Sequence, residues 1–223
     1  GTSTATTGTG TQLGTKAYNT NYNNNMYVGF RYTSGQVHGT GTPSTILGAD
    51  NSTDATTLNG FYNTKIKGTQ YEKFIDQNAG FCNDRTPSTS NTTSNGSGGT
   101  GTTATYYGPY IRLLSNGSYR STQTVTMKCN ESDLFTATTS NKGNKSLANP
   151  IGLITADEVV YAGGFGGASN SNYWLYTNQY YWTMSPSDYH GSHARVFYVR
   201  DDGNLNYGYH VNGTYGVRPV INL

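Results

Sequence analysis

The sequence predicts one domain of α+β fold, with helices early in the chain and an antiparallel set of short strands at its C-terminal end. Helix-compatible spacing of apolar residues is strongest over residues 53–78, whereas runs of aromatic and apolar residues fill residues 173–223. Only 12% of the residues are charged and 33% are hydrophobic, so the polarity comes from Thr, Ser, Asn, Gly and Tyr. This composition is typical of extracellular β-rich proteins. The aromatic content of 13% is too high for a chain that is disordered throughout.

The first third of the chain changes composition twice. Residues 1–25 are rich in Thr, Gly and Asn and are predicted to form an N-terminal arm or stalk, and residues 26–223 are predicted to form the domain. Apolar and aromatic residues at 26–32 predict a first strand, which a turn-rich loop follows. Residues 53–78 are predicted to be helical, and Gly68 divides this region into two helices or ends the first one.

The middle of the chain alternates between polar tracts and short apolar runs. Residues 86–104 are rich in Ser, Thr, Asn and Gly and are predicted to form an exposed flexible loop. Strands are predicted at 106–114 and at 125–129. Thr155 followed three residues later by Glu158 is a capping-box pattern, which predicts a short helix that stops at the next pair of glycines.

The last fifty residues read as short strands joined by turns. Asp-Asp-Gly at 201–203 is a strong turn signal, so the two strands beside it are expected to form a hairpin. The predicted strands are 173–176, 180–184, 194–199, 204–207 and 216–221.

Net charge and hydropathy exclude several partners. The formal net charge is +2, and Lys and Arg form no run, which argues against nucleic acid and against an anionic lipid surface as partners. No apolar stretch is long enough to span a bilayer, so we expect no membrane insertion by this segment. The chain starts at Gly1 without a recognisable signal peptide, and we expect a mature or trimmed form.

Cys82 and Cys129 are the two cysteines. They have no Cys-x-x-Cys spacing and no nearby histidine, so they do not form a zinc site by themselves. In an exported protein we favour a disulfide over two free thiols. Such a bridge would stabilise the fold by about 4 kcal/mol.

The sequence gives little support for catalysis or for a metal. His190, His193 and His210 share the C-terminal stretch with Asp188, and two histidines three residues apart plus a carboxylate are able to ligate zinc. We favour the alternative that they are surface ligand contacts, because nothing in the sequence fixes their convergence. No nucleophile elbow, phosphate loop or His-Glu-x-x-His motif occurs. We therefore expect a protein that is not an enzyme and has no cofactor or bound metal.

Three segments carry a resemblance to a known family. IGLITADEV at 151–159, YWTMSPS at 181–187 and GVRPVINL at 216–223 resemble a bacterial family of C-type-lectin fold related to formylglycine-generating enzymes. Within it, the chain is similar to the variable proteins of diversity-generating retroelements, in particular a gut-bacterial group displayed on pilin-like stems. The resemblance implies a C-type-lectin-like fold. The oxidases of the family use a close pair of cysteines late in the chain, which is missing here, so only the fold carries over.

The resemblance also implies a hypervariable ligand-binding surface at about residues 185–215. In such variable proteins a reverse transcriptase that miscopies adenines rewrites C-terminal codons, and AAC-type codons cannot become Lys, Glu, Gln, Met or Trp in this way. From Ser185 to Leu223 the chain contains none of these five residue types, although all five occur earlier.

The same stretch mixes regularly placed apolar residues with residue types that suit an interface. Tyr gives a large contact area at low entropic cost, Arg gives planar multidentate contacts, and Asn, Ser and Asp adapt their hydrogen bonding. The predicted ligand-binding residues are Asp188, Tyr189, His190, Ser192, His193, Arg195, Phe197, Tyr198, Arg200, Asp202, Asn204, Asn206, Tyr207, Tyr209, His210, Asn212 and Tyr215.

The leading hypothesis is therefore a monomeric extracellular or cell-surface protein that binds an unidentified macromolecule, protein or glycan. One alternative is a structural minor pilin or adhesin subunit, in which the Thr/Gly-rich start is a stalk and the contacts are to neighbouring subunits. A second alternative is a glycan-binding lectin that does not need calcium.

Overall fold

The structure is a computed structural model that describes residues 12–33, 50–88, 99 and 101–223. The other residues include the start of the predicted N-terminal arm and most of the predicted loop at 86–104. The prediction for residues 1–11 and most of the prediction for 86–104 therefore lie outside the described residues.

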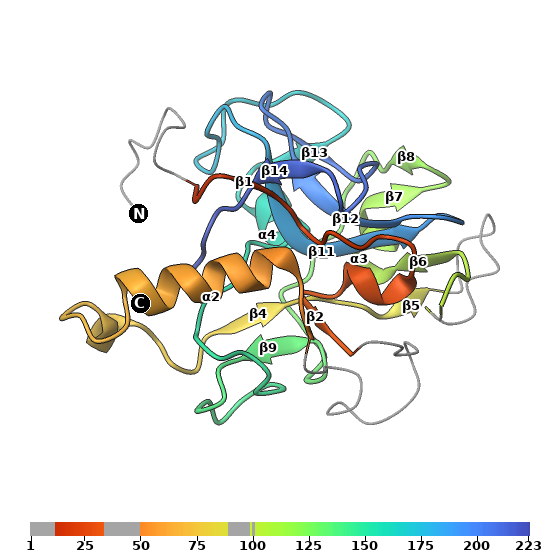
Figure 1. Ribbon diagram of the computed structural model, residues 1–223. Helices are drawn as coiled ribbons and strands as arrows, with labels where there is room; N and C mark the ends of the chain where they lie inside the picture. The colour runs from red at the N-terminus through yellow and green to blue at the C-terminus, as the bar shows by residue number, and fades with distance from the viewer. Residues whose placement is uncertain (1–11, 34–49, 89–98, 100) are drawn as a thin grey trace.

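The centre of the molecule is an eight-stranded sheet (Figure 1). Its strands follow the order β1-β14-β11-β12-β13-β10, and β6 pairs with both β11 and β5. The neighbours β11, β12 and β13 are antiparallel, whereas β10 runs parallel to β13 and β14 runs parallel to β11. The strands are β1 (Thr15–Ala17), β5 (Pro87–Ser88), β6 (Thr105–Tyr107), β10 (Phe165–Gly166), β11 (Tyr181–Tyr189), β12 (Ala194–Val199), β13 (Asn204–Asn206) and β14 (Thr214–Gly216).

The sheet separates two hydrophobic cores. Alternate side chains of a strand point to opposite faces, so Val196 and Tyr198 of β12 enter one core while Phe197 and Val199 enter the other. Helix α2 (Thr53–Lys65) supplies the first core, and α3 (Gly108–Leu113) and α4 (Ala156–Tyr161) supply the second. Because both faces are covered, all nine residues of β11 are buried.

The helices begin where local capping chemistry allows it. The Ser52 side chain accepts a hydrogen bond from the Ala55 backbone N–H and starts α2. The predicted capping box is confirmed at α4, where Thr155 and Glu158 bond reciprocally to each other's backbone N–H. After α2 the chain turns at Gly68, whose φ of +75° favours glycine, and one short 3-10 helix, η2 (Glu72–Phe74), follows.

The described residues also form three two-stranded sheets and one more 3-10 helix. Asn24 caps this helix, η1 (Asn25–Val28), through its side chain. The small sheets pair β2 (Arg31–Tyr32) with β3 (Asp50–Asn51), β4 (Gly80–Cys82) with β9 (Leu134–Thr136), and β7 (Leu114–Ser115) with β8 (Ser118–Tyr119).

The α+β class is confirmed, as are the helix that begins at Thr53 and the β12–β13 hairpin around residues 201–203. Five predicted strands need correction, and one of them is 216–221, of which only Gly216 lies in a strand, at the end of β14. The segment 26–32 forms η1 before the two residues of β2, and 106–114 forms the end of β6 and then α3, which Pro109 starts at a position that needs no backbone donor. The predicted strands at 125–129 and 173–176 do not pair with any strand of the described chain.

The boundary placed at residue 25 also differs from the structure. Strand β1 pairs with β14, Tyr18 is fully buried, and the Trp182 indole N–H donates to the Lys16 carbonyl at 2.8 Å. Residues 12–25 are therefore part of the domain. Most of them are short and polar, and only a few of their side chains, such as that of Tyr18, enter the core.

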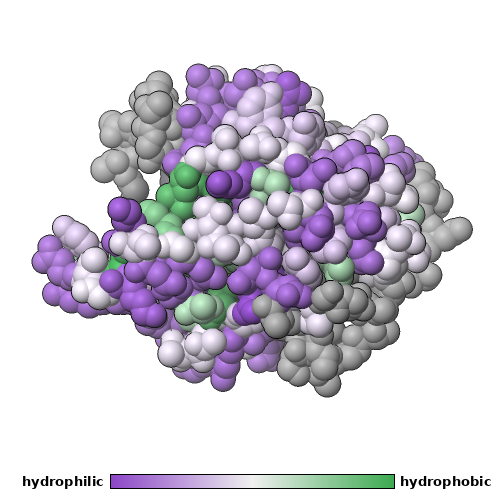
Figure 2. Space-filling model, viewed as in Figure 1, coloured by the Kyte–Doolittle hydropathy of each residue, from purple (hydrophilic) through white to green (hydrophobic). Residues whose placement is uncertain are grey.

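The face that carries α2 and β1 is mostly hydrophilic or neutral, with small separate hydrophobic areas (Figure 2). Within the described ranges, every helix is too short or too polar to cross a membrane.

Candidate functional site

Three segments from opposite ends of the chain meet at the turn between β11 and β12. The Ala194 N–H donates to the Tyr22 carbonyl at 2.7 Å, and the Val211 N–H donates to the Ala194 carbonyl at 3.0 Å. The Asn19 N–H in turn donates to the Val211 carbonyl at 3.0 Å. The backbone thus fixes the segment before η1, the β11–β12 turn and the loop between β13 and β14 against one another.

Rings from these segments and from the neighbouring strands form a continuous series. The rings of Tyr22 and His193 stack with centroids 4.8 Å apart, and those of His193 and His210 stack at 3.7 Å. Further contacts join Tyr209 to His210 at 6.4 Å, Tyr209 to Tyr215 at 4.8 Å, and Tyr215 to Tyr180 at 5.0 Å. We call the set the aromatic row; its members are Tyr22, His193, His210, Tyr209, Tyr215 and Tyr180.

The aromatic row has a buried base and exposed members. Trp182 and Tyr198 lie in the first core, and each has its ring 4.7 Å from the Tyr215 ring. Tyr22 and Tyr209 have 36% and 44% of their surface exposed, and the other members are partly exposed. Packing onto a rigid base fixes the ring orientations, so the row offers ring faces and polar edges at little cost in side-chain entropy.

A charged pair lies next to the aromatic row. Asp188 on β11 is buried, and its Oδ1 lies 3.6 Å from the Arg195 Nη1 on β12. The Ser187 hydroxyl donates to the other carboxylate oxygen at 2.7 Å. Burial raises the pKa of Asp188 to about 6, against a smaller lowering by the Arg195 charge and the Ser187 hydrogen bond. At neutral pH the carboxyl group is mostly ionised.

The pKa of His210, a member of the aromatic row, is also shifted. Burial lowers the pKa of His210 below its ordinary value, and the nearby His193 and Arg195 lower it further. His210 is therefore mostly neutral at pH 7, which lets its ring stack on the ring of His193 without charge repulsion.

Five of the predicted ligand-binding residues are buried and cannot contact a ligand on the surface. Phe197 belongs to the second core and Tyr198 to the first, because β12 is covered on both faces. Tyr189 is also a core residue, and its hydroxyl donates to the Asn23 carbonyl. Asp188 and Asn204 are buried polar residues. The interface-type composition of the stretch concealed this, since Tyr, Phe, Asp and Asn serve a polar core as well.

The other predicted residues lie at least partly at the surface, but they do not form one patch. Those in the turn and in the β13–β14 loop surround the aromatic row: His190, Ser192, His193, Arg195, Tyr209, His210, Asn212 and Tyr215. Tyr207 instead packs on Tyr110 and Tyr119 and donates its hydroxyl hydrogen to the Gly117 carbonyl. Arg200 and Asp202 form a separate ion pair at 3.7 Å, and Asn206 remains half-buried on β13.

Two members of the aromatic row were missed by the sequence analysis. Tyr22 lies in the segment interpreted as an arm, more than 160 residues from His193, and no local pattern predicts that contact. Tyr180 directly precedes β11 and falls before the interval predicted to bind ligand. Its place in a Tyr-Tyr-Trp run was the available signal.

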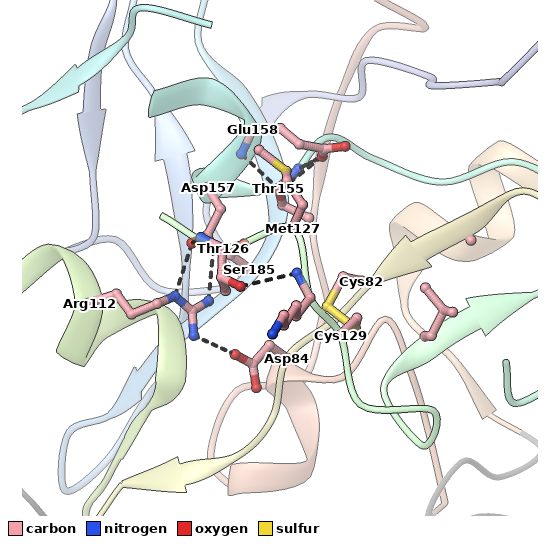
Figure 3. Close-up of a pocket in the computed structure, with 13 residues that line it drawn as sticks. Cys82, Asp84, Arg112, Thr126, Met127, Cys129, Thr155, Asp157, Glu158 and Ser185 are labelled. Atoms are coloured by element: carbon pink, nitrogen blue, oxygen red, sulfur yellow. Dashed lines mark hydrogen bonds and ion pairs between the residues drawn. A yellow bond between two sulfur atoms is a disulfide. The ribbon is translucent and has the colours of Figure 1, made fainter. Parts of the chain in front are cut away.

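A second polar site lies beside the disulfide that joins Cys82 to Cys129, which confirms the predicted bridge (Figure 3). We call this hollow of about 150 Å³ the disulfide pocket. Its lining residues are Gly80, Cys82, Asp84, Arg112, Thr126, Met127, Lys128, Cys129, Leu134, Thr155, Asp157, Glu158 and Ser185.

The polar groups of the disulfide pocket bind one another. Arg112 donates to Asp157 through Nε at 2.9 Å and Nη2 at 2.8 Å, and to Asp84 through Nη1 at 2.8 Å (Figure 3). The Thr126 backbone N–H also donates to Asp157, and the Ser185 hydroxyl accepts from the Ala156 N–H. This network ties α3, α4 and the segment before Cys129 together, so its role is to stabilise the fold.

Neither site gathers metal ligands. Across the described residues, no group of three or more His, Cys, Asp or Glu side chains is placed to hold a metal ion. His193 and His210 meet through their ring faces, which is not how imidazoles coordinate a common ion.

One protein-family model matches the chain. It is described as a domain of unknown function (DUF6273), and it covers residues 83–223, which include β6, β11–β14 and most of the aromatic row. A search of curated proteins and a search of solved structures found no match.

Proposed function

We propose that this chain, which belongs to the DUF6273 family, is a secreted or surface-displayed protein that binds a macromolecular ligand through the aromatic row and the polar side chains around it. The observation that carries the proposal is the row itself, whose six partly exposed rings pack on a base of Trp182 and Tyr198. Four of the rings come from the three segments that meet at the β11–β12 turn, and the other two from β14 and from the residue before β11. Partly exposed rings contribute little to the packing of the core, and a surface made of them is well suited to recognition.

The residue types of the row favour a protein or glycan over a small metabolite. Tyr209 and Tyr22 present ring faces together with hydroxyl groups, and the neighbouring Arg195 side chain is 21% exposed. Rings with polar edges give large contact areas and adaptable hydrogen bonds, as in antibody loops. The disulfide pocket lacks this character, because the charge of Arg112 is already paired with those of Asp84 and Asp157.

We further propose that the exposed positions are diversified by a retroelement, on a C-type-lectin-like version of the α+β fold. His190, Ser192, Tyr209 and Asn212 are exposed, while Val196, Leu205 and Val211 between them and Val217 after them are fully buried. Substitutions at the exposed positions therefore leave the core unchanged, which is what a diversified surface requires. The buried residues of the predicted set are not part of this proposal.

The disulfide supports an extracellular or cell-surface location. Disulfides form and persist in oxidising compartments, and this bridge closes a loop over 47 residues of sequence.

A pair of displayed libraries tests the proposed function. One library randomises His190, Ser192, Tyr209 and Asn212, and the control library randomises the equally exposed Ser115, Ser118, Ser121 and Thr124, which lie outside the aromatic row. We expect both libraries to remain folded and only the first to yield binders to a purified test protein such as lysozyme. Binders from both libraries at equal frequency, or widespread unfolding of the first library, would contradict the proposal.

A further inference from the structure

We propose that the aromatic row is a pH-dependent surface, closed at neutral pH and opened in mild acid by the His193–His210 stack together with the Asp188–Arg195 pair. The consequence for ligand binding rests on the proposed function, whereas the opening itself does not. Two observations carry the inference, one at each pair.

The first observation is the face-to-face contact of two histidines. Their centroids are 3.7 Å apart with an angle of 18° between the ring planes, and the Tyr22 ring covers the other face of His193. Neutral imidazoles tolerate this arrangement, but two imidazolium ions at that distance repel each other. A group that must stay neutral to keep its contact is a pH-sensitive element.

The second observation is the incomplete pairing of Asp188 with Arg195. Asp188 Oδ1 and Arg195 Nε are both buried and have no hydrogen-bond partner, and the ion pair itself spans 3.6 Å. The backbone of Arg195 also forms a β-bridge with that of His210, so the arginine lies next to both Asp188 and the histidine stack. At neutral pH the Asp188 carboxylate attracts the guanidinium group of Arg195 and compensates its positive charge.

The groups that face Asp188 come from every element packed around it. Arg195 on β12 and His190 in the turn are the positively charged or titratable partners, and Ser187 is the hydrogen-bond donor. Tyr107 on β6, Tyr110 on α3 and Tyr207 after β13 also interact with its charge. All three tyrosine pKa values are raised, mainly by burial, so these side chains stay neutral. Protonation of Asp188 therefore leaves Arg195 without a countercharge among them.

The directions of the pKa shifts fit this sequence of events. The pKa of Asp188 is raised to about 6, so the folded state accepts this proton readily as the pH falls below 6. The pKa of His210 is lowered by burial, by His193 and by Arg195, so the closed stack resists protonation. Protonation of His210 is more favourable after the ring leaves the stack, so a lower pH favours the open state. The uncompensated charge of Arg195 repels the protonated ring and favours the open state further.

The loop between β13 and β14 is the segment that opens. It carries Tyr209 and His210, and the Val211 N–H joins it to the Ala194 carbonyl on β12. The Gly213 N–H returns to the His210 carbonyl within the loop. The Val211 carbonyl also accepts from the Asn19 N–H, so opening has to break the two backbone bonds of Val211 together with the ring contacts of His210 and Tyr209.

Amide hydrogen exchange measured at pH about 7.5 and at pH about 5 tests the inference without any ligand. After correction for intrinsic exchange, we expect protection of the amides of Val211 and Gly213 to fall about tenfold in acid, relative to β12. His210→Gln keeps a neutral planar side chain and should remove most of that fall, and His193→Gln provides a second variant should the first not fold. Equal protection at both pH values, or the same fall in a folded glutamine variant, would overturn the inference.

The two proposals fail in distinguishable ways. For a binder selected from the first library, we expect weaker binding to the test protein at pH about 5 than at pH about 7.5, with a smaller ratio in the His210→Gln background. If the loop opens in acid but the libraries yield no binder, the proposed function fails and the pH-dependent opening stands. If binders are found but the loop does not open, the inference fails and the proposed function stands.

Discussion

The aromatic row and the disulfide pocket both collect polar side chains near β11, but they treat charge differently. In the pocket, Arg112 lies 2.8 Å from a carboxylate oxygen of Asp84 and 2.8 Å from one of Asp157. Beside the row, the Asp188–Arg195 pair spans 3.6 Å and leaves polar atoms without a hydrogen bond. A fully paired network stabilises a fold, whereas an incompletely paired one keeps the capacity to respond to a proton or a ligand.

The largest effect on stability is expected when the disulfide beside the pocket is removed. Replacing both Cys82 and Cys129 by Ser should lower the free energy of unfolding by about 4 kcal/mol, because the open chain regains the entropy of a long loop. Urea unfolding of the oxidised protein and the double variant measures the difference. The reduced wild-type protein is the control and should match the variant; a loss under about 1 kcal/mol would mean that the pocket holds without its bridge.

Arg112→Met should cost somewhat less, about 3 kcal/mol, since it leaves the mostly buried Asp157 without a countercharge while Arg112 itself is partly exposed. The matched control is Arg120→Met, which removes the same charge from an exposed position and should change stability by under about 0.5 kcal/mol. Thermal or urea unfolding of both variants decides. Equal losses would show that the network is not what distinguishes the pocket.

Asp188→Asn tests the incompletely paired carboxyl group beside the aromatic row through the pH dependence of stability. The folded-state pKa of about 6 lies above the ordinary value of 3.8, so the protonated carboxyl favours the folded state and that contribution is lost as the pH rises through 6. The stability of the wild type relative to Asp188→Asn should therefore fall by about 2 kcal/mol between pH about 4 and about 7. Urea unfolding across this range measures it; a constant difference would mean that the carboxyl titrates normally.

The smallest effect is expected at the exposed end of the aromatic row. Tyr209→Ala should change the free energy of unfolding by under about 1 kcal/mol, because 44% of the side chain is already exposed. Tyr198→Ala is the buried counterpart and should cost about 3 kcal/mol. Urea midpoints of the two variants test this contrast, and similar losses would show that the row is core rather than surface.

Local signals predicted what is built locally. The capping box at Thr155 and Glu158 specified α4, and Asp-Asp-Gly at 201–203 specified the β12–β13 hairpin. The strand expected at 106–114 became α3 after β6 because Pro109 suits the first turn of a helix, a preference that the apolar run outweighed in the sequence analysis.

Long-range packing is what the sequence concealed. Tyr22 reaches His193 only because β1 joins the sheet beside β14, and no pattern within residues 12–25 indicates that pairing. Likewise, β12 is covered on both faces, so the alternation that separates a buried from an exposed side is absent and Phe197 looks like an interface residue. The polar residues around the row were predictable from their types, whereas their division into surface and core needed the fold.

We propose that the exposed positions around the aromatic row form a diversified binding surface. Sequencing the encoding locus in several isolates of one strain tests it most directly, without knowledge of the ligand. Codons for exposed residues such as His190, Tyr209 and Asn212 should differ among isolates, while those for Val196 and Leu205 should not. An unchanging stretch, or changes scattered equally over buried and exposed codons, would contradict it.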